Sequence, residues 1–145
     1  MTTAAIVKHV MQTDFLRLTP TMQIREAVAV FAKLRISAAP VVDEGGALAG
    51  ILTERDCLRP MLNASYYQQW EGSVADFMTR EVRSVPVDLD LVSAAEEFLS
   101  RSHRVYPVMR DEDIVGLLHR SDLFAAILAL SEQPTGRSQR PPQWS

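Results

Sequence analysis

The sequence predicts an α/β fold of the α+β type, built from two pseudo-symmetric units that each run strand, helix, strand, strand, helix. The first observation behind this prediction is an internal repeat. Met11 recurs as Met78, 67 positions later, and Asp56 recurs as Asp122, 66 positions later. The second observation is that both copies alternate short β-branched runs with apolar residues at helical spacing. Units of roughly 60 residues are marginal alone, so we expect the two to bury their apolar faces together.

In the first copy, the pattern predicts strands over 15–18, 40–42 and 48–52, a helix over 24–34 and a second helix from Thr53 onward. The first helix begins after Thr19-Pro20, because proline disfavours helix at the residue before it. Its apolar stripe is expected to contain Ile24, Ala27, Val28, Phe31 and Leu34. The apolar side of the second helix is expected to contain Leu58, Met61 and Leu62.

The second copy repeats this plan. The pattern predicts a strand over 83–87, a helix over 91–99, hairpin strands over 106–109 and 114–118, and a final helix over 122–130. The two helices are expected to place on their apolar faces Leu91, Ala94, Ala95, Phe98 and Leu99, and Leu123, Ala126, Ile127 and Leu130. Short leading helices are expected at 6–11 and 73–78.

These elements predict a first domain over 6–66 and a second over 73–131, followed by a polar, proline-rich tail over 132–145 that we expect to be disordered. The connecting segment 63–72 holds Tyr66, Tyr67 and Trp70, which is too aromatic for a flexible linker. We expect it to pack against the module or against another chain.

Charge and hydropathy argue against several classes of function. The net charge of −3 disfavours non-specific nucleic-acid binding, because phosphate contacts need a basic surface. No apolar run approaches the roughly 20 residues that span a bilayer. The N-terminus lacks the basic region and apolar core of a signal peptide. We therefore expect a cytoplasmic protein with no membrane insertion and no nucleic-acid partner.

Side-chain chemistry gives no indication of an enzyme. Cys57 is the only cysteine, so an intrachain disulfide and a thiolate cluster are excluded, and buried packing is its expected role. The three histidines, His9, His103 and His119, are widely spaced and lack a metal-ligand pattern. No nucleophile–base arrangement or glycine-rich phosphate loop is recognisable. We expect no catalytic residue, no metal site and no required cofactor.

The strongest chemical signal is the turn at Thr53, where a strand ends and a helix begins. Free backbone N–H groups and the helix dipole attract a phosphate at such a point. The hydroxyl of Thr53 can donate to a phosphate oxygen, Arg55 can neutralise charge, and Asp56 can accept from two ribose hydroxyls. The alternative is that Thr53 and Asp56 form only a helix cap, which would contribute about 1 kcal/mol without a ligand.

The β-α-β-β-α order, Ala39-Pro-Val-Val-Asp43 and Gly50-Ile-Leu-Thr-Glu-Arg-Asp56 together resemble a tandem cystathionine-β-synthase (CBS) domain pair, or Bateman module. The resemblance covers residues 6–130 and implies a stand-alone regulatory module rather than an enzyme. It implies two clefts that hold an adenine nucleotide, AMP, ADP or ATP, and less commonly NAD or S-adenosylmethionine. It also implies a homodimer and an unidentified enzyme or transporter as the regulated partner.

By this resemblance, the threonine contacts phosphate and the aspartate contacts ribose in the first site. The small residues before the second strand leave room for a flat base, although simple core packing explains them as well. The full first site is expected to comprise Leu18, Thr19, Ile36, Ser37, Ala38, Ala39, Pro40, Thr53, Arg55 and Asp56.

The second copy departs from the pattern, because His119 replaces the threonine and Tyr106 stands where the first copy has Ala39. His119 can bind phosphate, more strongly when protonated, or it can fill the pocket. Tyr106 can stack on a base or block it. The second site is expected to comprise Val85, Arg104, Val105, Tyr106, Pro107, His119, Arg120 and Asp122.

Two functions follow from these residues. The first is a non-catalytic sensor that binds an adenine nucleotide between the paired domains and transmits a conformational signal. The alternative is a structural interaction module whose nucleotide sites no longer bind.

Overall fold

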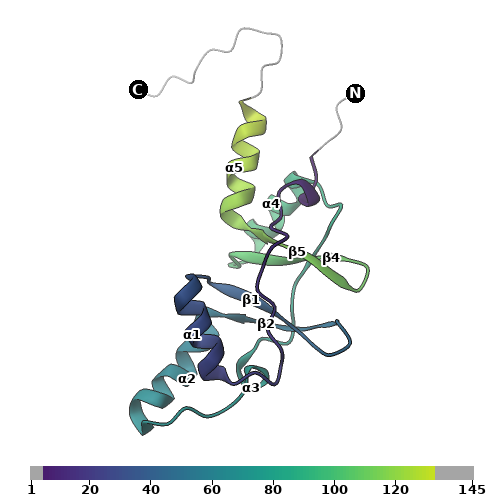
Figure 1. Cartoon of the computed structure of the whole chain (residues 1–145). Helices are drawn as coiled ribbons and strands as arrows, with labels where there is room; N and C mark the ends of the chain where they lie inside the picture. Colours follow the sequence, from purple (N-terminus) through teal and green to yellow (C-terminus); the bar gives the residue numbers. More distant parts are fainter. Residues whose placement is uncertain (1–4, 133–145) are drawn as a thin grey trace, which may run out of the picture.

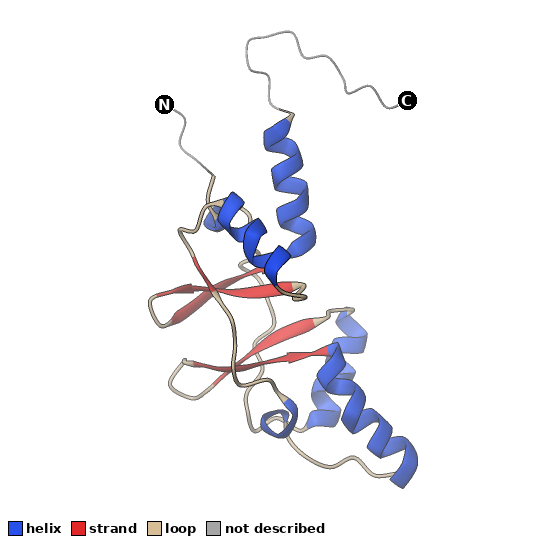
Figure 2. Cartoon of the chain, turned by 180° about the vertical axis from the view of Figure 1, so that it is seen from behind, coloured by secondary structure: helices blue, strands red, loops and turns tan. Residues whose placement is uncertain are grey.

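The computed structural model describes residues 5–132 and places two small β-sheets back to back, with helices on the outer side of each (Figures 1 and 2). Its elements are η1 (Val7–His9), α1 (Ile24–Leu34), β1 (Ala38–Val42), β2 (Leu48–Thr53), α2 (Glu54–Tyr67), α3 (Val74–Phe77), β3 (Val85–Pro86), α4 (Leu91–Ser100), β4 (Val105–Arg110), β5 (Asp113–His119) and α5 (Arg120–Ser131). Helices α1 and α2 cover one sheet, and α4 and α5 cover the other. The mixed α/β class and the repeated element order are confirmed.

The two sheets share one pairing scheme. Strands β1 and β2 pair antiparallel, as do β4 and β5. Strand β3 pairs parallel with β4. In the first copy the predicted strand over 15–18 shrinks to a single parallel bridge between Leu18 and Val41. The hydrogen bonds of that bridge, from the Leu18 amide to the Pro40 carbonyl (2.9 Å) and from the Val42 amide to the Leu18 carbonyl (2.8 Å), keep the same parallel arrangement.

The leading segment of each copy crosses to the other copy. Gln12 pairs with Leu117 of β5, and Thr79 pairs with Ile51 of β2. Val7 accordingly lies in the core of the second copy, and Val74 lies in the core of the first. This exchange links the two units through backbone hydrogen bonds as well as through apolar contact.

Three apolar clusters hold the fold together. The first packs α1 and α3 against β1 and β2, and the second packs η1, α4 and α5 against β3, β4 and β5. The third lies between the two sheets, where Ala38, Ile51, Val105, Ile114 and Leu117 meet. The expectation that the two units bury apolar faces against each other therefore has a structural basis in this third cluster.

Each predicted helix face differs in part from the structure, and in α1 and α5 the exceptions are Leu34 and Leu130, which are 52% and 43% exposed. In α2 the buried residues are Cys57 and Pro60, whereas Leu58, Met61 and Leu62 are 55%, 41% and 56% exposed. In α4, Leu99 is 87% exposed. The apolar pattern alone could not show which side of each helix faces its sheet, because both sides of these helices carry apolar residues.

The connecting segment divides into two parts. Helix α2 extends to Tyr67, so Tyr66 and Tyr67 lie at its end and are more than 70% exposed. Trp70 instead packs against the first core, as predicted for contact with the module. The predicted disordered tail from Gln133 onward lies outside the described residues.

Candidate functional site

A cleft of about 720 Å³ opens where the two copies meet. One wall comes from the first copy, with Leu16 before the Leu18 bridge and with Ile36 and Ser37 before β1. The opposite wall comes from the end of β5 in the second copy, with Leu117 and His119. The cleft therefore combines the segment before a strand in one copy with the end of a strand in the other.

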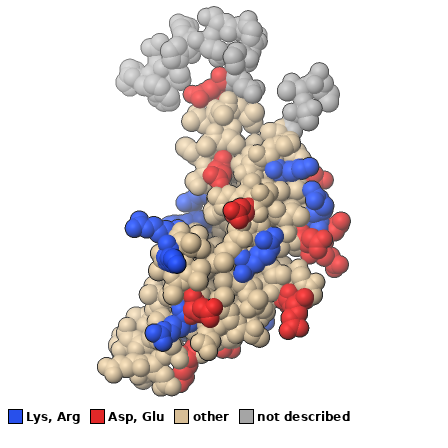
Figure 3. Space-filling view, in the orientation of Figure 1, with Lys and Arg blue, Asp and Glu red and all other residues tan. Residues whose placement is uncertain are grey.

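A second hollow of about 410 Å³ continues from this cleft. It shares Ser37 and His119 with the cleft and adds Arg104 and Arg120, together with Ser121 and Phe124. Basic side chains gather at the level where the two halves meet, on the left in the space-filling view (Figure 3). The cleft thus combines apolar side chains with the charged side chains of Asp14, Arg35 and Glu54, whereas the hollow beside it has a basic lining.

The turn at Thr53 is closed by its own side chains. The Thr53 hydroxyl oxygen accepts a hydrogen bond from the Asp56 amide (3.2 Å), and the Asp56 carboxylate accepts one from the Thr53 amide (3.0 Å). The hydroxyl of Thr79, in the exchanged segment, also donates to this carboxylate (3.3 Å). The predicted cap is therefore present, and the carboxylate of half-buried Asp56 is held by two groups, the Thr53 amide and the Thr79 hydroxyl.

The equivalent turn in the second copy is open. His119 is the residue before α5, and its side chain makes no capping hydrogen bond. Within residues 5–132, Asp122 forms no side-chain hydrogen bond of the kind that Asp56 forms. The backbone geometry is nonetheless the same, because the Arg120 amide donates to the Arg104 carbonyl and the Glu54 amide donates to the Ser37 carbonyl, both at 2.9 Å.

Some of the residues expected in the first site line the cleft, and others do not. Ile36, Ser37 and Ala38 line the cleft, whereas neither Thr53 nor Asp56 lines either hollow. Leu18, Ala39 and Pro40 are fully buried, and the first two belong to the first core, which fits the core-packing alternative. Thr19 and Arg55 are exposed.

The residues expected in the second site are divided in the same way. Arg104, His119 and Arg120 line the hollow beside the cleft. Val85, Val105, Tyr106 and Pro107 are buried. Asp122 is half-buried and directly follows Ser121 of the hollow.

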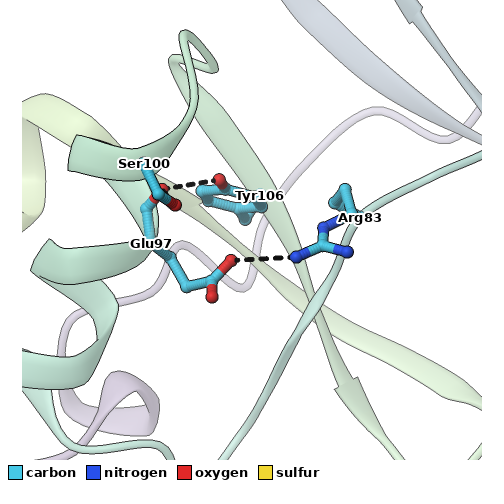
Figure 4. A network of polar contacts seen from close by, with 4 residues as sticks. All are labelled: Arg83, Glu97, Ser100 and Tyr106. Atoms are coloured by element: carbon cyan, nitrogen blue, oxygen red, sulfur yellow. Dashed lines mark hydrogen bonds and ion pairs between the residues drawn. The ribbon is translucent and has the colours of Figure 1, made fainter.

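Tyr106 has a structural role in this conformation. Its side chain is wholly buried, lies edge-on to Phe98 with ring centroids 4.8 Å apart, and is stacked by His103 at 5.1 Å. Its hydroxyl donates to the Glu97 carbonyl of α4 (3.1 Å), as Figure 4 shows. Burial, followed by the negative charge of Glu97, raises the pKa of Tyr106. The ring faces are covered, so no base stacks on them here.

A further hollow, of about 710 Å³, lies between α4 and the segment that leads into β3. Arg83 and Glu97 form an ion pair across it at 3.7 Å (Figure 4). Both side chains are more than a third exposed, so this pair contributes little to stability. Val85 of the expected second site contributes to this hollow rather than to the cleft.

Several cleft residues were not predicted from the sequence. Leu16, Leu117 and Phe124 were expected only as strand or helix positions, and Gln12 belongs to the exchanged leading segment. The register of the repeat could have indicated Gln12, because it is the counterpart of Thr79, which contacts Asp56. The sequence of one copy alone could not predict that its leading segment pairs with the other copy.

Other chemistry-bearing groups lie away from the cleft. Cys57 is buried, and burial together with the nearby charges of Asp56 and Glu54 raises its pKa from 9.0 to about 11, so the thiol is held protonated. Within the described residues, no group of three His, Cys, Asp or Glu side chains is placed to hold a metal ion. No helix in that part of the chain has the length and apolarity to cross a membrane.

Sequence comparisons point to one family. The CBS domain profile matches residues 7–63 and 74–129. The CBS domain-containing protein YhcV of Bacillus subtilis is 26% identical over 130 residues, covering 90% of this chain and 89% of YhcV. The inosine-5'-monophosphate dehydrogenase of Aquifex aeolicus is 33% identical over 108 residues, covering 72% of this chain. The chain spans 21% of that enzyme and 46% of MJ1225, a relative from Methanocaldococcus jannaschii.

Solved structures share the fold. The CBS-pair protein CBSX2 of Arabidopsis thaliana, in complex with AMP, has a TM-score of 0.77 at 22% identity, over 88% of this chain and 98% of CBSX2. The CBS domain pair of protein MJ0100, in complex with 5′-methylthioadenosine and S-adenosyl-L-methionine, has a TM-score of 0.74 at 23% identity, over 90% of this chain and all of that pair. This chain therefore belongs to the CBS domain family, and its two matched regions form a tandem CBS pair with the Bateman-module fold.

Proposed function

We propose that this protein is a non-catalytic sensor that binds an adenine nucleotide in the cleft between its two CBS domains. The observation that carries the proposal is the cleft itself, where Leu16, Ile36 and Leu117 offer apolar walls for a base and the adjoining hollow offers basic groups for phosphate. The family membership, and the adenosyl ligands bound to CBSX2 and MJ0100, support the choice of ligand. No step of this function needs a catalytic group or a metal.

Within this proposal, the open turn of the second copy is the primary site. Ser37 and His119 lie on both hollows. Asp122 lines neither hollow but directly follows Ser121 of the second, and its half-buried carboxylate can accept from ribose hydroxyls. Thr53, Arg55 and Asp56 remain the proposed residues of a second, related site. There a ligand has to share the Asp56 carboxylate with the Thr53 amide and the Thr79 hydroxyl.

Signalling requires that the ligand bind two conformations with different affinities. A ligand held between copies contacts both sheets, and the exchanged segments connect these sheets through the Gln12–Leu117 and Ile51–Thr79 pairs. We propose that occupancy changes the relative placement of the two copies and that a partner protein detects this change.

We also propose that the module forms a homodimer through α2 and α5. Leu58 and Leu62 of α2 are exposed, and so are their repeat counterparts Phe124 and Leu128 of α5. Equivalent apolar faces on both copies suit a twofold contact. Light scattering on the Leu62→Lys and Leu128→Lys variants tests this: a monomer is expected from each, and an unchanged mass would remove these faces from consideration.

The binding test is a thermal-shift panel with AMP, ADP, ATP, NAD, S-adenosylmethionine and GTP, followed by calorimetry on any ligand that stabilises. A ligand at about 100 times its Kd stabilises by roughly 2.7 kcal/mol, which raises the Tm by several degrees. Asp122→Ala is expected to weaken binding about tenfold, with Asp88→Ala as the exposed control. A flat response to every adenine ligand would reject the sensor and favour the alternative, a structural interaction module with non-binding sites.

A further inference from the structure

We propose that the cleft selects nucleotides that carry two or more phosphates over a nucleoside monophosphate. This inference rests on the proposed function and specifies the ligand of that same site. The phosphate chain lies in the hollow formed by Arg104, His119 and Arg120, while the nucleoside lies in the adjoining cleft.

The side chains that line the two hollows differ in chemistry, and this difference determines which end of the ligand lies in which hollow. Leu16, Ile36 and Leu117 line the cleft. Its charged side chains are Asp14, Glu54 and Arg35, so both of the acidic groups lie on the cleft and not on the hollow beside it. The adjoining hollow is lined by two arginines, one histidine and two serines, with Phe124 at its edge and no acidic side chain. Because Ser37 and His119 lie on both, one molecule can occupy both hollows, with its apolar end in the first and its anionic end in the second.

The arginines are available for an anion. Within residues 5–132, one ion pair is shorter than 4.0 Å, and it joins Arg83 and Glu97. Neither Arg104 nor Arg120 is therefore paired with a carboxylate of that part of the chain. Both side chains are exposed. Unpaired guanidinium groups on one hollow favour a ligand with complementary charge in a chain whose net charge is −3.

The donors on this hollow can hold more than one phosphate group. Each guanidinium carries five N–H donors in a planar fork and binds phosphate through two parallel hydrogen bonds. Two such forks, with His119 and Ser121 beside them, can each hold a separate phosphate group. A diphosphate or triphosphate supplies the additional oxygens and the additional negative charge.

The open turn of α5 adds to this capacity. In α2 the Thr53 hydroxyl occupies the Asp56 amide, whereas the His119 side chain does not occupy the corresponding amide of α5. At the start of α5 the second copy therefore leaves a backbone N–H group available to a ligand, which the first copy does not at the start of α2.

The test is calorimetry on the full chain with AMP, ADP and ATP, at constant ionic strength and with EDTA to exclude divalent cations. We expect ADP or ATP to bind at least tenfold more tightly than AMP. In Arg104→Gln/Arg120→Gln, the ratio of ATP to AMP affinity is expected to fall toward one. The matched control is Arg110→Gln, an exposed arginine at the end of β4, outside both hollows.

The outcomes separate this inference from the proposed function. If AMP binds as tightly as ADP and ATP, the inference fails and the sensor function stands. If no adenine nucleotide binds, both fail. A loss in Arg110→Gln as large as in the double variant would attribute the preference to overall charge and overturn the inference. The comparison of AMP with ATP on the unmodified chain remains decisive even if the double variant does not fold.

Discussion

The two strand-to-helix turns of this protein start from the same sequence pattern and reach different states. At the first turn, Thr53 and Asp56 cap each other, and the hydroxyl of Thr79 completes the coordination of the carboxylate. At the second, His119 cannot reproduce the threonine cap, and the turn opens onto the hollow with Arg104 and Arg120. The pattern that predicted the best ligand site thus has a strong structural function in the first copy. The divergent copy keeps more of its polar groups available to a ligand.

The largest expected effect tests how each copy holds the segment exchanged from the other. A Cβ added at Gly50 would lie 2.7 Å from the Thr79 carbonyl, a backbone atom fixed by the hydrogen bonds between Thr79 and Ile51. At Gly116 the added Cβ would lie 2.5 Å from the sulfur of the flexible Met11 side chain, and the fixed Gln12 carbonyl, the counterpart of the Thr79 carbonyl, is farther away at 3.0 Å. Gly50→Ala is expected to lower the free energy of unfolding by about 3 kcal/mol, and Gly116→Ala by about half of that.

Urea denaturation measures both variants. The control is Gly45→Ala, whose added Cβ would meet nothing closer than 3.5 Å and which should change stability by less than about 0.5 kcal/mol. Equal losses at Gly50 and Gly116 would show that the two exchanged segments are held with the same rigidity, contrary to this comparison.

The next effect concerns the aspartates of the two turns. Asp56→Ala removes a reciprocal cap and a contact with Thr79, so we expect a loss of about 1–2 kcal/mol. Asp122→Ala removes no hydrogen bond seen within residues 5–132, so we expect a change of about 0.5 kcal/mol or less. Chemical denaturation compares the two, and a larger loss at Asp122 would contradict the assignment of the stabilising cap to the first copy.

Sequence reasoning predicted local structure better than it predicted which parts meet. The apolar stripe of 24–34 correctly predicted α1, because helical periodicity is a local property. Ile24, Ala27 and Phe31 of that stripe are buried, whereas Leu34 is 52% exposed. That Ser37 and His119 line the same cleft was not predicted, since it depends on how one copy is placed against the other. The burial of Tyr106 was likewise left open, because its partners on α4 are fixed only by tertiary packing.

Replacing His119 by threonine gives the second turn the capping residue of the first. The threonine hydroxyl can accept from the Asp122 amide, so His119→Thr is expected to stabilise the protein by about 1 kcal/mol. Ligand binding should change as well. The imidazole of His119 lines both hollows, so its loss is expected to lower nucleotide affinity.

His119→Gln removes the imidazole without supplying a threonine hydroxyl, so it isolates the contribution of His119 to binding. We expect this variant to lose about threefold to tenfold in nucleotide affinity, measured by calorimetry. Equal affinities in the unmodified protein and in His119→Gln would show that His119 does not contact the phosphate.

The smallest expected effect on stability comes from a buried thiol that the first copy has and the second copy lacks. Cys57 follows Asp56 in α2, and its counterpart in α5 is the apolar Leu123, which is equally buried. Burial raises the pKa of Cys57 to about 11, whereas the thiol ionises near 9.0 in the unfolded chain. Above pH 9 the unfolded state therefore binds fewer protons than the native state, so stability falls as the pH rises.

Between pH 9 and pH 10 this group should lower the free energy of unfolding by at most about 1 kcal/mol. Denaturation of the unmodified protein and of Cys57→Ala at both pH values isolates the contribution, because lysines and tyrosines titrate alike in the two. A steeper fall in the unmodified protein would mean that alkaline sensitivity originates in the first copy, beside the same Asp56 that closes its turn. Identical slopes would show that the thiol can ionise in the native state, which would require solvent to reach the core beneath α2.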